Sequence, residues 1–317
     1  MYKCTDRYKH KDTAHVLCKS LHMHKQVHIY TYIHTNNSTK RCTTSMLCVL
    51  VCVCLCVKAQ KLCTFLFTQP ARTSTHIHTH IHAHTHKHKY VRAGWGNDEE
   101  QFYTDGSNAK IENGTLIIEI REESAPNDAN PYTSTRMITK NKYERKYGRI
   151  EARARLPGTQ SLWSAIWLLG ANIDDVIWPD AGELDILEML GDMPNRMYSA
   201  VHGPGYSGED SVLHKYTLEN TNFTDDFHDF QLTWYPDSVK FWVDGILVGI
   251  TSRSDIEQEG NKWVFDHPFY ILINVAVGGL WPGYPDESTV MPQRMEVDYV
   301  RVYEENGAAP PQVCLNS

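Results

Sequence analysis

Cysteine is almost absent from the last two thirds of this 317-residue sequence: eight of the nine cysteines lie at or before Cys63, and only Cys314 follows. Residues 91–317 therefore have no internal disulfide framework. Basic side chains are scarce there too. Residues 1–90 hold 13 of the 31 Lys and Arg and two of the 38 Asp and Glu (+11), which leaves 18 basic and 36 acidic residues in 91–317 (−18). An acidic domain repels phosphates, so we expect no nucleic-acid partner.

No hydrophobic run is long enough to span a bilayer, which takes roughly 20 residues. The main apolar run, Met46–Val57 (MLCVLVCVCLCV), has 12 residues. That is the length of a signal-peptide core, and small residues at Val57 and Ala59 suit a cleavage site. An internal start at Met46 would make residues 46–59 a nearly complete signal peptide. We predict no membrane span.

Residues 1–90 show no sustained helix or strand periodicity, and a histidine stands at every second position of His76–Lys89 (HIHTHIHAHTHKHK). Three interpretations are open: a loose zinc or nickel site, a disordered polar tract, or a translated dinucleotide repeat. Alternating His-Thr is what a CA repeat encodes, and the Val-Cys alternation of the earlier run is what a TG repeat encodes. We interpret residues 1–90 as a low-complexity or disordered segment or as a gene-model artefact. We favour either of these interpretations over a metal-binding tract.

From residue 91 onward, short stretches of alternating polar and apolar residues are separated by turn residues, and no amphipathic helix longer than about ten residues stands out. Asn113-Gly114 and Asp244-Gly245 each predict a two-residue hairpin turn, because both positions accept positive φ angles. A short helical turn is predicted in Ser252–Gln258. We predict one all-β domain over residues 91–304, a jelly-roll β-sandwich of two antiparallel sheets, followed by a tail over residues 305–317.

Three acids, Glu183, Asp185 and Glu188, interrupt the otherwise apolar stretch Trp178–Leu190 (WPDAGELDILEML). Glu183 and Asp185 point to the same face of a strand, whereas Glu188 is out of phase with them. A β-bulge between Asp185 and Glu188 would turn Glu188 onto that face as well. A solvated acidic sheet surface is the alternative interpretation.

Aromatic residues lie near these acids in the sequence. A pyranose packs its C–H face on a flat aromatic ring, and glycoside hydrolysis needs one carboxylate ionised while another holds a proton. The neighbouring side chains are Trp163, Trp167, Trp178 and His202. Their presence favours a sugar-cleaving groove over a solvated surface.

The segment GELDILEMLG resembles the signature E-[LI]-D-[IV]-x-E of glycoside hydrolase family 16. Other blocks resemble the family in the same order: GWGNDEEQFYTD (94–105), TSTRMITKNKYERKYGRIEARARLP (133–157), LWSAIWLLG (162–170), FYILINVAVGGLWPG (269–283) and VDYVRVY (297–303). The resemblance covers residues 94–304. The bulged spacing and HGPGYSG (202–208) look most like the endo-β-1,3-glucanases, or laminarinases, of that family.

The resemblance implies a substrate cleft on the concave face of one sheet and a retaining endo-hydrolase of β-1,3-glucan, with mixed-linkage β-glucan as a further substrate. Glu183 would be the nucleophile, Glu188 the acid/base, and Asp185 the residue that hydrogen-bonds the nucleophile and helps to set the pKa values of the pair. The alternative is a non-catalytic β-glucan recognition protein on the same fold. Such proteins usually lack the two glutamates.

The same resemblance implies a set of substrate-binding residues: Asn97, Arg136, Trp163, Trp178, His202 and Trp281. We expect Trp163 to contact the ligand, Trp167 to lie in the core, and Trp281 to close the cleft from a loop. No cofactor or catalytic metal is expected. Many family members carry a structural calcium, for which Asp298 is the matching acid. We expect a secreted monomer, and the sequons Asn113-Gly-Thr and Asn222-Phe-Thr agree with secretion.

One departure from the family lies at the start of the domain. The family normally begins with an Asp-Glu-Phe strand ahead of the GWGN block, and nothing in residues 60–93 resembles it. We therefore expect an edge strand to be missing or to be supplied by unrelated sequence. A missing edge strand would uncover unpaired backbone groups and lower stability.

Overall fold

The computed structural model describes residues 95–125 and 130–303, together with the backbone of seven short strands that precede them. The chain divides into two units, residues 1–71 with 77–80 and residues 72–76 with 81–317. The described residues of the first unit form three antiparallel strand pairs: β1 (Arg7–His10) with β2 (Thr13–Val16), β3 (Thr31–Ile33) with β4 (Val49–Val51), and β5 (Cys54–Val57) with β6 (Gln60–Cys63). Half of residues 46–59 and the whole of 305–317 lie outside the described residues, so the signal-like run and the tail stay predictions.

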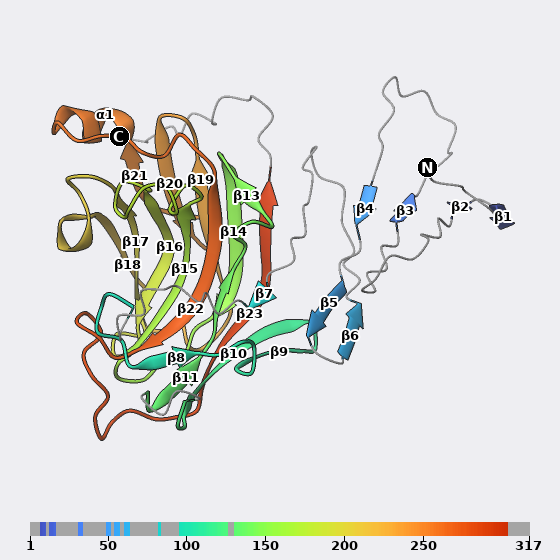
Figure 1. The fold of residues 1–317 in the computed structure, drawn as a ribbon, viewed down its shortest axis with the longest axis horizontal. Coiled ribbons are helices and arrows are strands. Elements are labelled where there is room, and N and C mark those ends of the chain that lie inside the picture. The colour runs from blue at the N-terminus through green and yellow to red at the C-terminus, as the bar shows by residue number, and fades with distance from the viewer. Residues whose placement is uncertain are drawn as a thin grey trace. The chain divides into compact units, whose positions relative to one another are not determined.

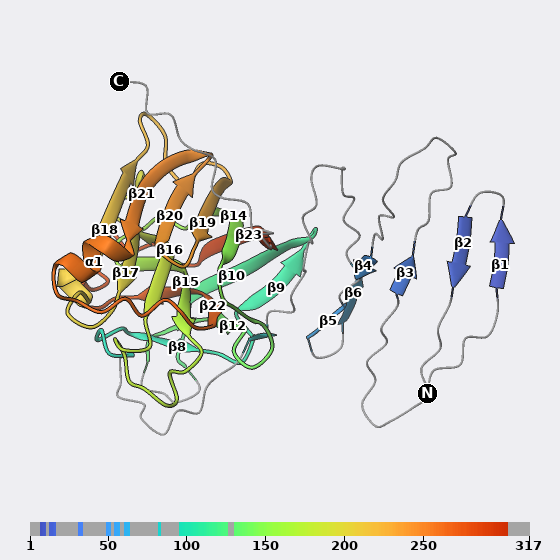
Figure 2. The same ribbon diagram turned by 90° about the horizontal axis from the view of Figure 1, so that it is seen from above.

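Two sheets make up the second unit (Figures 1 and 2). Sheet 1 runs in the order β21 (Ile246–Ser252), β20 (Ser238–Val243), β19 (His228–Trp234), β14 (Gly148–Arg155), β23 (Gln293–Tyr303), β10 (Thr115–Glu122), β11 (Tyr132–Ser134) and β8 (Gln101–Tyr103), with β9 (Ala109–Glu112) also paired to β10. Sheet 2 runs in the order β18 (Val212–Thr217), β17 (Arg196–His202), β16 (Glu183–Leu190), β15 (Leu162–Gly170), β22 (Phe269–Val277), β12 (Arg136–Ile138) and β7 (His82–Ala83), with β13 (Glu144–Arg145) also paired to β22. Among the described pairs only β8 with β11 is parallel.

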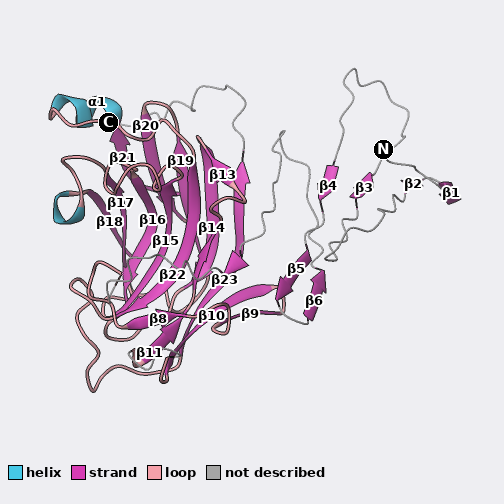
Figure 3. Cartoon of the chain, in the orientation of Figure 1, coloured by secondary structure: helices cyan, strands magenta, loops and turns pink. Residues whose placement is uncertain are grey.

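The main hydrophobic core lies between the two sheets. Strand β14 shows why: its residues alternate between buried and half-buried along its whole length, so Ile150, Ala152 and Ala154 enter the core while the intervening charged residues face outward. Strand β22 contributes Ile271, Ile273 and Val275 from the opposite sheet. The predicted all-β jelly roll is therefore confirmed, and Figure 3 shows how fully strands dominate the described part.

The predicted turns are also confirmed. Asn113 and Gly114 have φ angles of 49° and 86° between β9 and β10, and Asp244 and Gly245 have 50° and 77° between β20 and β21. The expected helical turn is α1 (Arg253–Gln258), whose first turn is capped by the side chain of Ser252. In Figure 1, α1 lies at one end of the long strands and β8 to β11 lie at the other. None of the helices in the described residues has the length and apolarity needed to cross a bilayer.

Two residues of the histidine tract take part in sheet 2. His82 and Ala83 form β7, which pairs with Ile138 and Met137 of β12 in antiparallel register. Of the two outcomes expected for the missing first strand, the structure shows the second. Unrelated sequence supplies a short edge strand.

Candidate active site

Strand β16 carries the three acids and lies between β15 and β17 in sheet 2. Glu183 lies opposite His202 of β17, Asp185 opposite Ala200 and Glu188 opposite Tyr198. Three steps along β16 thus match two steps along β17 between Asp185 and Glu188. The predicted β-bulge is confirmed at this position.

The bulge places two consecutive residues in the core. Ile186 and Leu187 are both buried in the cluster between the sheets, so the alternation resumes with Glu188 on the outer face. The hydroxyl of Ser199 on β17 donates a hydrogen bond of 2.8 Å to the backbone oxygen of Ile186. A buried side chain thereby satisfies a carbonyl at the irregularity. We call the resulting surface, which bears Glu183, Asp185 and Glu188, the carboxylate face.

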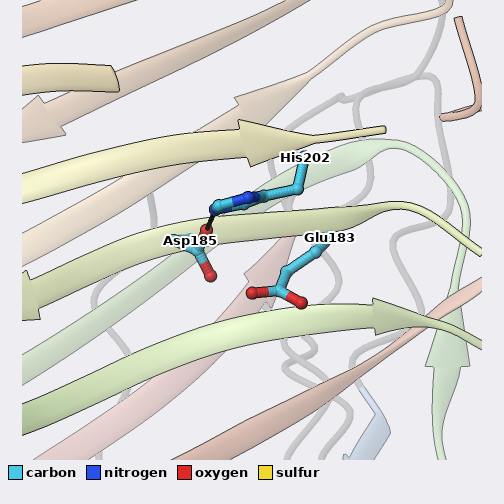
Figure 4. Close-up of side chains that lie close together, drawn as sticks. All are labelled: Glu183, Asp185 and His202. Atoms are coloured by element: carbon cyan, nitrogen blue, oxygen red, sulfur yellow. Dashed lines mark ion pairs between the residues drawn. The ribbon is translucent and has the colours of Figure 1, made fainter. Parts of the chain in front are cut away.

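His202 lies beside Asp185 on the carboxylate face (Figure 4). The backbone N–H of Gly208 donates to Nδ1 of His202 at 3.1 Å, so a neutral His202 carries its proton on Nε2. That nitrogen lies 3.0 Å from Oδ2 of Asp185. The contact is electrostatic rather than an aligned hydrogen bond, because Oδ2 has no aligned donor among the described residues. The imidazole therefore presents an N–H dipole to the middle carboxylate.

The same tautomer decides what the cluster can bind. Ligand atoms of Glu183, Asp185 and His202 all lie within 4.8 Å of one another, a spacing that a metal ion could use. A metal would need a lone pair on Nε2, and the N–H of Gly208 already occupies the lone pair on Nδ1. The geometry of His202 thus favours a hydrogen-bonding role over metal ligation.

Indole N–H groups contact the two outer carboxylates. Nε1 of Trp178, in the loop between β15 and β16, donates to Oε2 of Glu183 at 2.8 Å. Nε1 of Trp163, on the neighbouring strand β15, donates to Oε1 of Glu188 at 3.0 Å. Each glutamate therefore has one fixed donor that leaves its other oxygen for a reacting group.

Burial raises the pKa of all three acids. The pKa of Glu183 rises to about 8, chiefly through burial and then through the charge of Asp185, against the lowering effects of His202, the Trp178 N–H and Arg136. Burial raises the pKa of Asp185 to about 8 as well. The pKa of Glu188 lies well above its ordinary value, again mainly through burial, and both other acids raise it further, while His202 and the Trp163 N–H oppose them. The cluster therefore retains protons near neutral pH.

Charge around the two glutamates is unequal. Arg136 acts on Glu183, whereas the charged neighbours that raise the pKa of Glu188 are two carboxylates. Opposite charge favours ionisation and like charge opposes it. Glu188 is consequently the better proton holder, and Glu183 the better anion.

Arg136 stands on β12 opposite Asn274 of β22. Its guanidinium lies over three aromatic rings, 4.7 Å from the Trp167 centroid, 5.2 Å from Trp95 and 5.9 Å from Tyr103. Stacked rings fix a guanidinium in orientation. The predicted binding residue is thus held in orientation by these rings, and its charge acts on Glu183.

Aromatic rings flank both ends of the cluster. At the Glu183 end, Trp178 packs against His202 with centroids 6.0 Å apart. At the Glu188 end, Trp281 packs edge-on against Trp163 at 5.1 Å and against Tyr198 at 5.3 Å. Both Trp178 and Trp281 keep about two fifths of their surface exposed, 42% and 40%. Exposed indoles at both ends can receive sugar rings.

Asn97, a predicted site residue, makes its recorded contacts with its own loop and with the loop of Leu280. Its side chain donates to Oε1 of Glu99 at 3.0 Å, and its backbone oxygen accepts the N–H of Leu280 at 3.0 Å. Asn97 thus holds the loop that carries Trp281.

Trp167 differs from the expectation of a core position. It is half-buried, packs on the small cluster of Ile138, Tyr270 and Leu272 rather than in the main core, and donates from Nε1 to Oδ1 of Asn274 at 2.8 Å. The reason is register: Trp167 lies opposite Asp185 and therefore shares the carboxylate face. Sequence reasoning also missed Trp95, Tyr103, Tyr198 and Asn274. Only Asn274 left a signal, a polar residue inside the apolar strand FYILINVAV.

Asp298, the acid matched to a structural calcium, lies on β23 with Oδ2 3.4 Å from Nε of Arg153. Calcium takes six to eight oxygen ligands. Within residues 95–125 and 130–303, no group of three carboxylate or histidine ligands includes Asp298. Asp298 and the side chains described around it therefore do not by themselves fit a calcium ion.

Comparison with known proteins gives concordant results. Residues 96–301 match the family model of the glycosyl hydrolases of family 16. A β-glucanase of Rhodothermus marinus is 37% identical over 218 residues, which cover 66% of this chain and 76% of that protein. The laminarinase catalytic domain of Thermotoga maritima is 50% identical, with a TM-score of 0.65 over 67% of this chain and 86% of that one. A β-1,3-glucan-binding protein of Penaeus monodon is 36% identical over 190 residues, 52% of each chain.

Proposed function

The chain belongs to family 16 of the glycosyl hydrolases, and on that premise we propose that it is an endo-hydrolase of β-1,3-glucan that retains the anomeric configuration. The observation that carries the proposal is the arrangement on β16: Glu183 and Glu188 share one face with Asp185 between them, and each glutamate accepts an indole N–H. Two carboxyl groups in unequal surroundings are what double displacement requires.

In the proposed reaction, an oxygen of Glu183 attacks the anomeric carbon while Glu188 gives its proton to the departing glycosidic oxygen. The carbon–oxygen bond to the leaving sugar breaks as the bond to Glu183 forms, giving a glycosyl ester. Glu188, now ionised, removes a proton from water, and that water displaces Glu183. The second inversion restores the original configuration.

Asp185 supports the nucleophile in this scheme. Burial raises the pKa of both Glu183 and Asp185, and such a close pair shares a proton, so the proton lies on Asp185 while Glu183 is ionised. When Glu183 becomes an ester, it no longer carries a charge, and the N–H of His202 stabilises an ionised Asp185. A negative charge on Asp185, stabilised by His202, thereby replaces the charge that Glu183 loses at the reacting centre.

Endo action is supported by the rings at both ends of the cluster. Trp178 lies at the Glu183 end, and Trp163 and Trp281 lie at the Glu188 end, so sugar units on either side of the cleaved bond have a ring to pack on. The similarity to a laminarinase domain at 50% identity supports β-1,3-glucan as the principal substrate. We propose mixed-linkage β-glucan as a secondary substrate.

A β-glucan polysaccharide stays outside cells, so we propose that the enzyme is secreted. We also propose that it acts as a monomer. The sequon residue Asn113 is exposed in the β9–β10 turn, where a glycan would meet no packed neighbour.

The test is release of reducing ends by the full chain from laminarin, lichenan and agarose, assayed side by side. We expect release from laminarin first, less from lichenan and none from agarose, and no release by Glu183→Gln. Asp180→Asn, an exposed acid in the preceding loop, is the matched control and should retain activity. A folded wild-type chain that binds laminarin but releases nothing would instead support the glucan-recognition alternative.

Azide separates the roles of the two glutamates. In Glu183→Ala a small anion can take the place of the nucleophile and form an α-glycosyl azide from an activated glycoside. In Glu188→Ala the anion attacks the glycosyl-enzyme and gives the β-glycosyl azide. If Glu183→Ala gave the β-glycosyl azide and Glu188→Ala the α-glycosyl azide, the nucleophile and the acid/base would be the other way round.

A further inference from the structure

Trp178 contributes the indole donor to Glu183 from a loop, not from a strand. Residues 171–182 connect β15 to β16, and the tip of this loop is open to solvent, with Ile177 79% exposed. In the described residues, Trp178 donates its N–H to Glu183 and packs against His202. Where the indole lies therefore depends on how the loop is held.

Contacts with backbone groups of the loop fix its two ends. The N–H of Ala171 donates to the carbonyl of Pro268 at 2.9 Å, and Nε2 of His267 lies 3.0 Å from the carbonyl of Ala181. In the first half, Ile173 packs on the small cluster of Ile138, Tyr270 and Leu272. Within the loop, the N–H of Gly182 donates to the carbonyl of Pro179 at 2.9 Å, and the N–H of Val176 donates to the carbonyl of Asn172 at 3.0 Å. These hydrogen bonds shape the turns on either side of Trp178 but do not join that segment to sheet 2.

An ion pair holds the loop between its base and its tip. Nζ of Lys140 lies 2.7 Å from Oδ1 of Asp174, four residues before Trp178. The Lys140 side chain is only 4% exposed, whereas that of Asp174 is 65% exposed. A buried ammonium needs a partner, so this contact is more firmly required than an ion pair between two exposed residues.

The pair also lies next to the carboxylate face. Lys140 follows β12, and its ammonium lies 5.7 Å from the ring centroid of Tyr270 on β22. Burial raises the pKa of the Tyr270 phenol, Arg136 lowers it, and the charges of Asp174 and Glu183 raise it further, so both carboxylates act on this ring. Lys140 thus ties the loop to the same sheet that positions Glu183.

We propose that Lys140 and Asp174 form a clamp that holds the 171–182 loop against sheet 2, so that Trp178 keeps its indole N–H on Glu183. Both are positioning residues that act through Trp178, and this inference rests on the function proposed above. The clamp matters most for the nucleophile, because misplacing a donor by about 1 Å can slow a reaction on the order of a hundredfold.

The experiment compares four variants of the full chain: Asp174→Ala, Asp174→Glu, Lys140→Met and Asp175→Ala. Asp175 is the matched control, an adjacent exposed acid for which the described residues show no ion pair. We expect Asp174→Ala and Lys140→Met to lower kcat/KM on laminarin by about tenfold. Asp174→Glu keeps a carboxylate within reach and should retain most activity, and Asp175→Ala should match the wild type.

Two further readouts distinguish positioning from mere stability. Loss of the Trp178 donor makes Glu183 harder to ionise, so the acidic limb of the kcat/KM profile should move to higher pH in Asp174→Ala, in the same direction as in Trp178→Phe. Amide hydrogen exchange should quicken in residues 171–182 of that variant and not in β16.

The clamp would be overturned if Asp174→Ala had a lower melting temperature but otherwise behaved like Asp175→Ala. In that case the acidic limb of its kcat/KM profile and the amide exchange rates of residues 171–182 would be unchanged. An inactive wild-type chain would refute the proposed function instead. The exchange comparison would then still decide whether the clamp exists.

Discussion

Glu188 of β16 lies opposite Tyr198 of β17. A regular ladder continued from Asp185 and Ala200 would instead pair Glu188 with Met197, whose side chain is fully buried in the core. The bulge thus keeps an ionisable group out of the hydrophobic interior and on the carboxylate face. Its integrity is a condition of the proposed chemistry.

Ser199→Ala should weaken the bulge. The variant leaves the buried carbonyl of Ile186 without its 2.8 Å donor, which costs about 1–3 kcal/mol of the free energy of unfolding. Denaturant titration measures this loss, and kcat should fall with it because Glu188 loses its support. Ser164→Ala is the control: the Ser164 hydroxyl is buried on β15 and has no hydrogen-bond partner among the described residues, so its removal should be neutral or slightly stabilising. Equal losses in both variants would contradict this role of Ser199.

Trp178→Phe and Trp163→Phe should move opposite limbs of the pH–rate profile. Each indole N–H lowers the pKa of the glutamate it contacts, so its removal raises that pKa. Glu183 must be ionised to attack, hence Trp178→Phe should shift the acidic limb of kcat/KM to higher pH. Glu188 must be protonated to act as acid, hence Trp163→Phe should shift the basic limb to higher pH.

Trp242→Phe serves as the control for both tryptophan variants. Its indole nitrogen is buried on β20 of the other sheet and has no hydrogen-bond partner in the part of the chain that the structure describes, so neither limb should move. Shifts of the same limb in Trp178→Phe and Trp163→Phe would contradict the assignment of the two glutamates.

Glu183→Gln should gain stability over the wild type as pH rises. The pKa of Glu183 is raised from an ordinary 4.5 to about 8 by burial and by Asp185. Below pH 4.5 both states hold the proton; between 4.5 and 8 only the folded state does, so wild-type stability falls across this window. Glutamine has no such loss. The melting-temperature difference between variant and wild type should therefore grow from about pH 4.5 to pH 8 and then level off.

An exposed acid provides the reference for this pH series. Glu219→Gln removes a carboxylate from the surface, and its difference from the wild type should show no comparable growth with pH. A melting-temperature difference for Glu183→Gln that stayed flat or shrank over the same window would mean that Glu183 is not held in a buried, acid-rich environment.

Much of this architecture could be predicted from local sequence. The alternation of β14, the turns at Asn113-Gly114 and Asp244-Gly245, and the bulge after Asp185 all follow from side-chain periodicity and backbone angles. Each depends on neighbours in the chain. The positions of the acids on one face could be predicted for the same reason.

Cross-strand contacts escaped prediction because the pairing of distant segments was unknown. Arg136 meets Trp167 because β12 and β15 both pair with β22. The Lys140–Asp174 pair joins residues 34 positions apart. The side to which Trp167 points became clear only from its register with Asp185. Such features require the topology of the sheet, which periodicity does not supply.

The central claim, double displacement by Glu183 and Glu188, is tested most directly by the anomeric form of the first product. Proton NMR recorded during the first minutes of laminarin hydrolysis by the full chain should show the β-anomer of the new reducing end, with the α-anomer growing later by mutarotation. Glu183→Gln should give neither signal. Initial appearance of the α-anomer, or an undiminished rate in Glu183→Gln, would contradict the account.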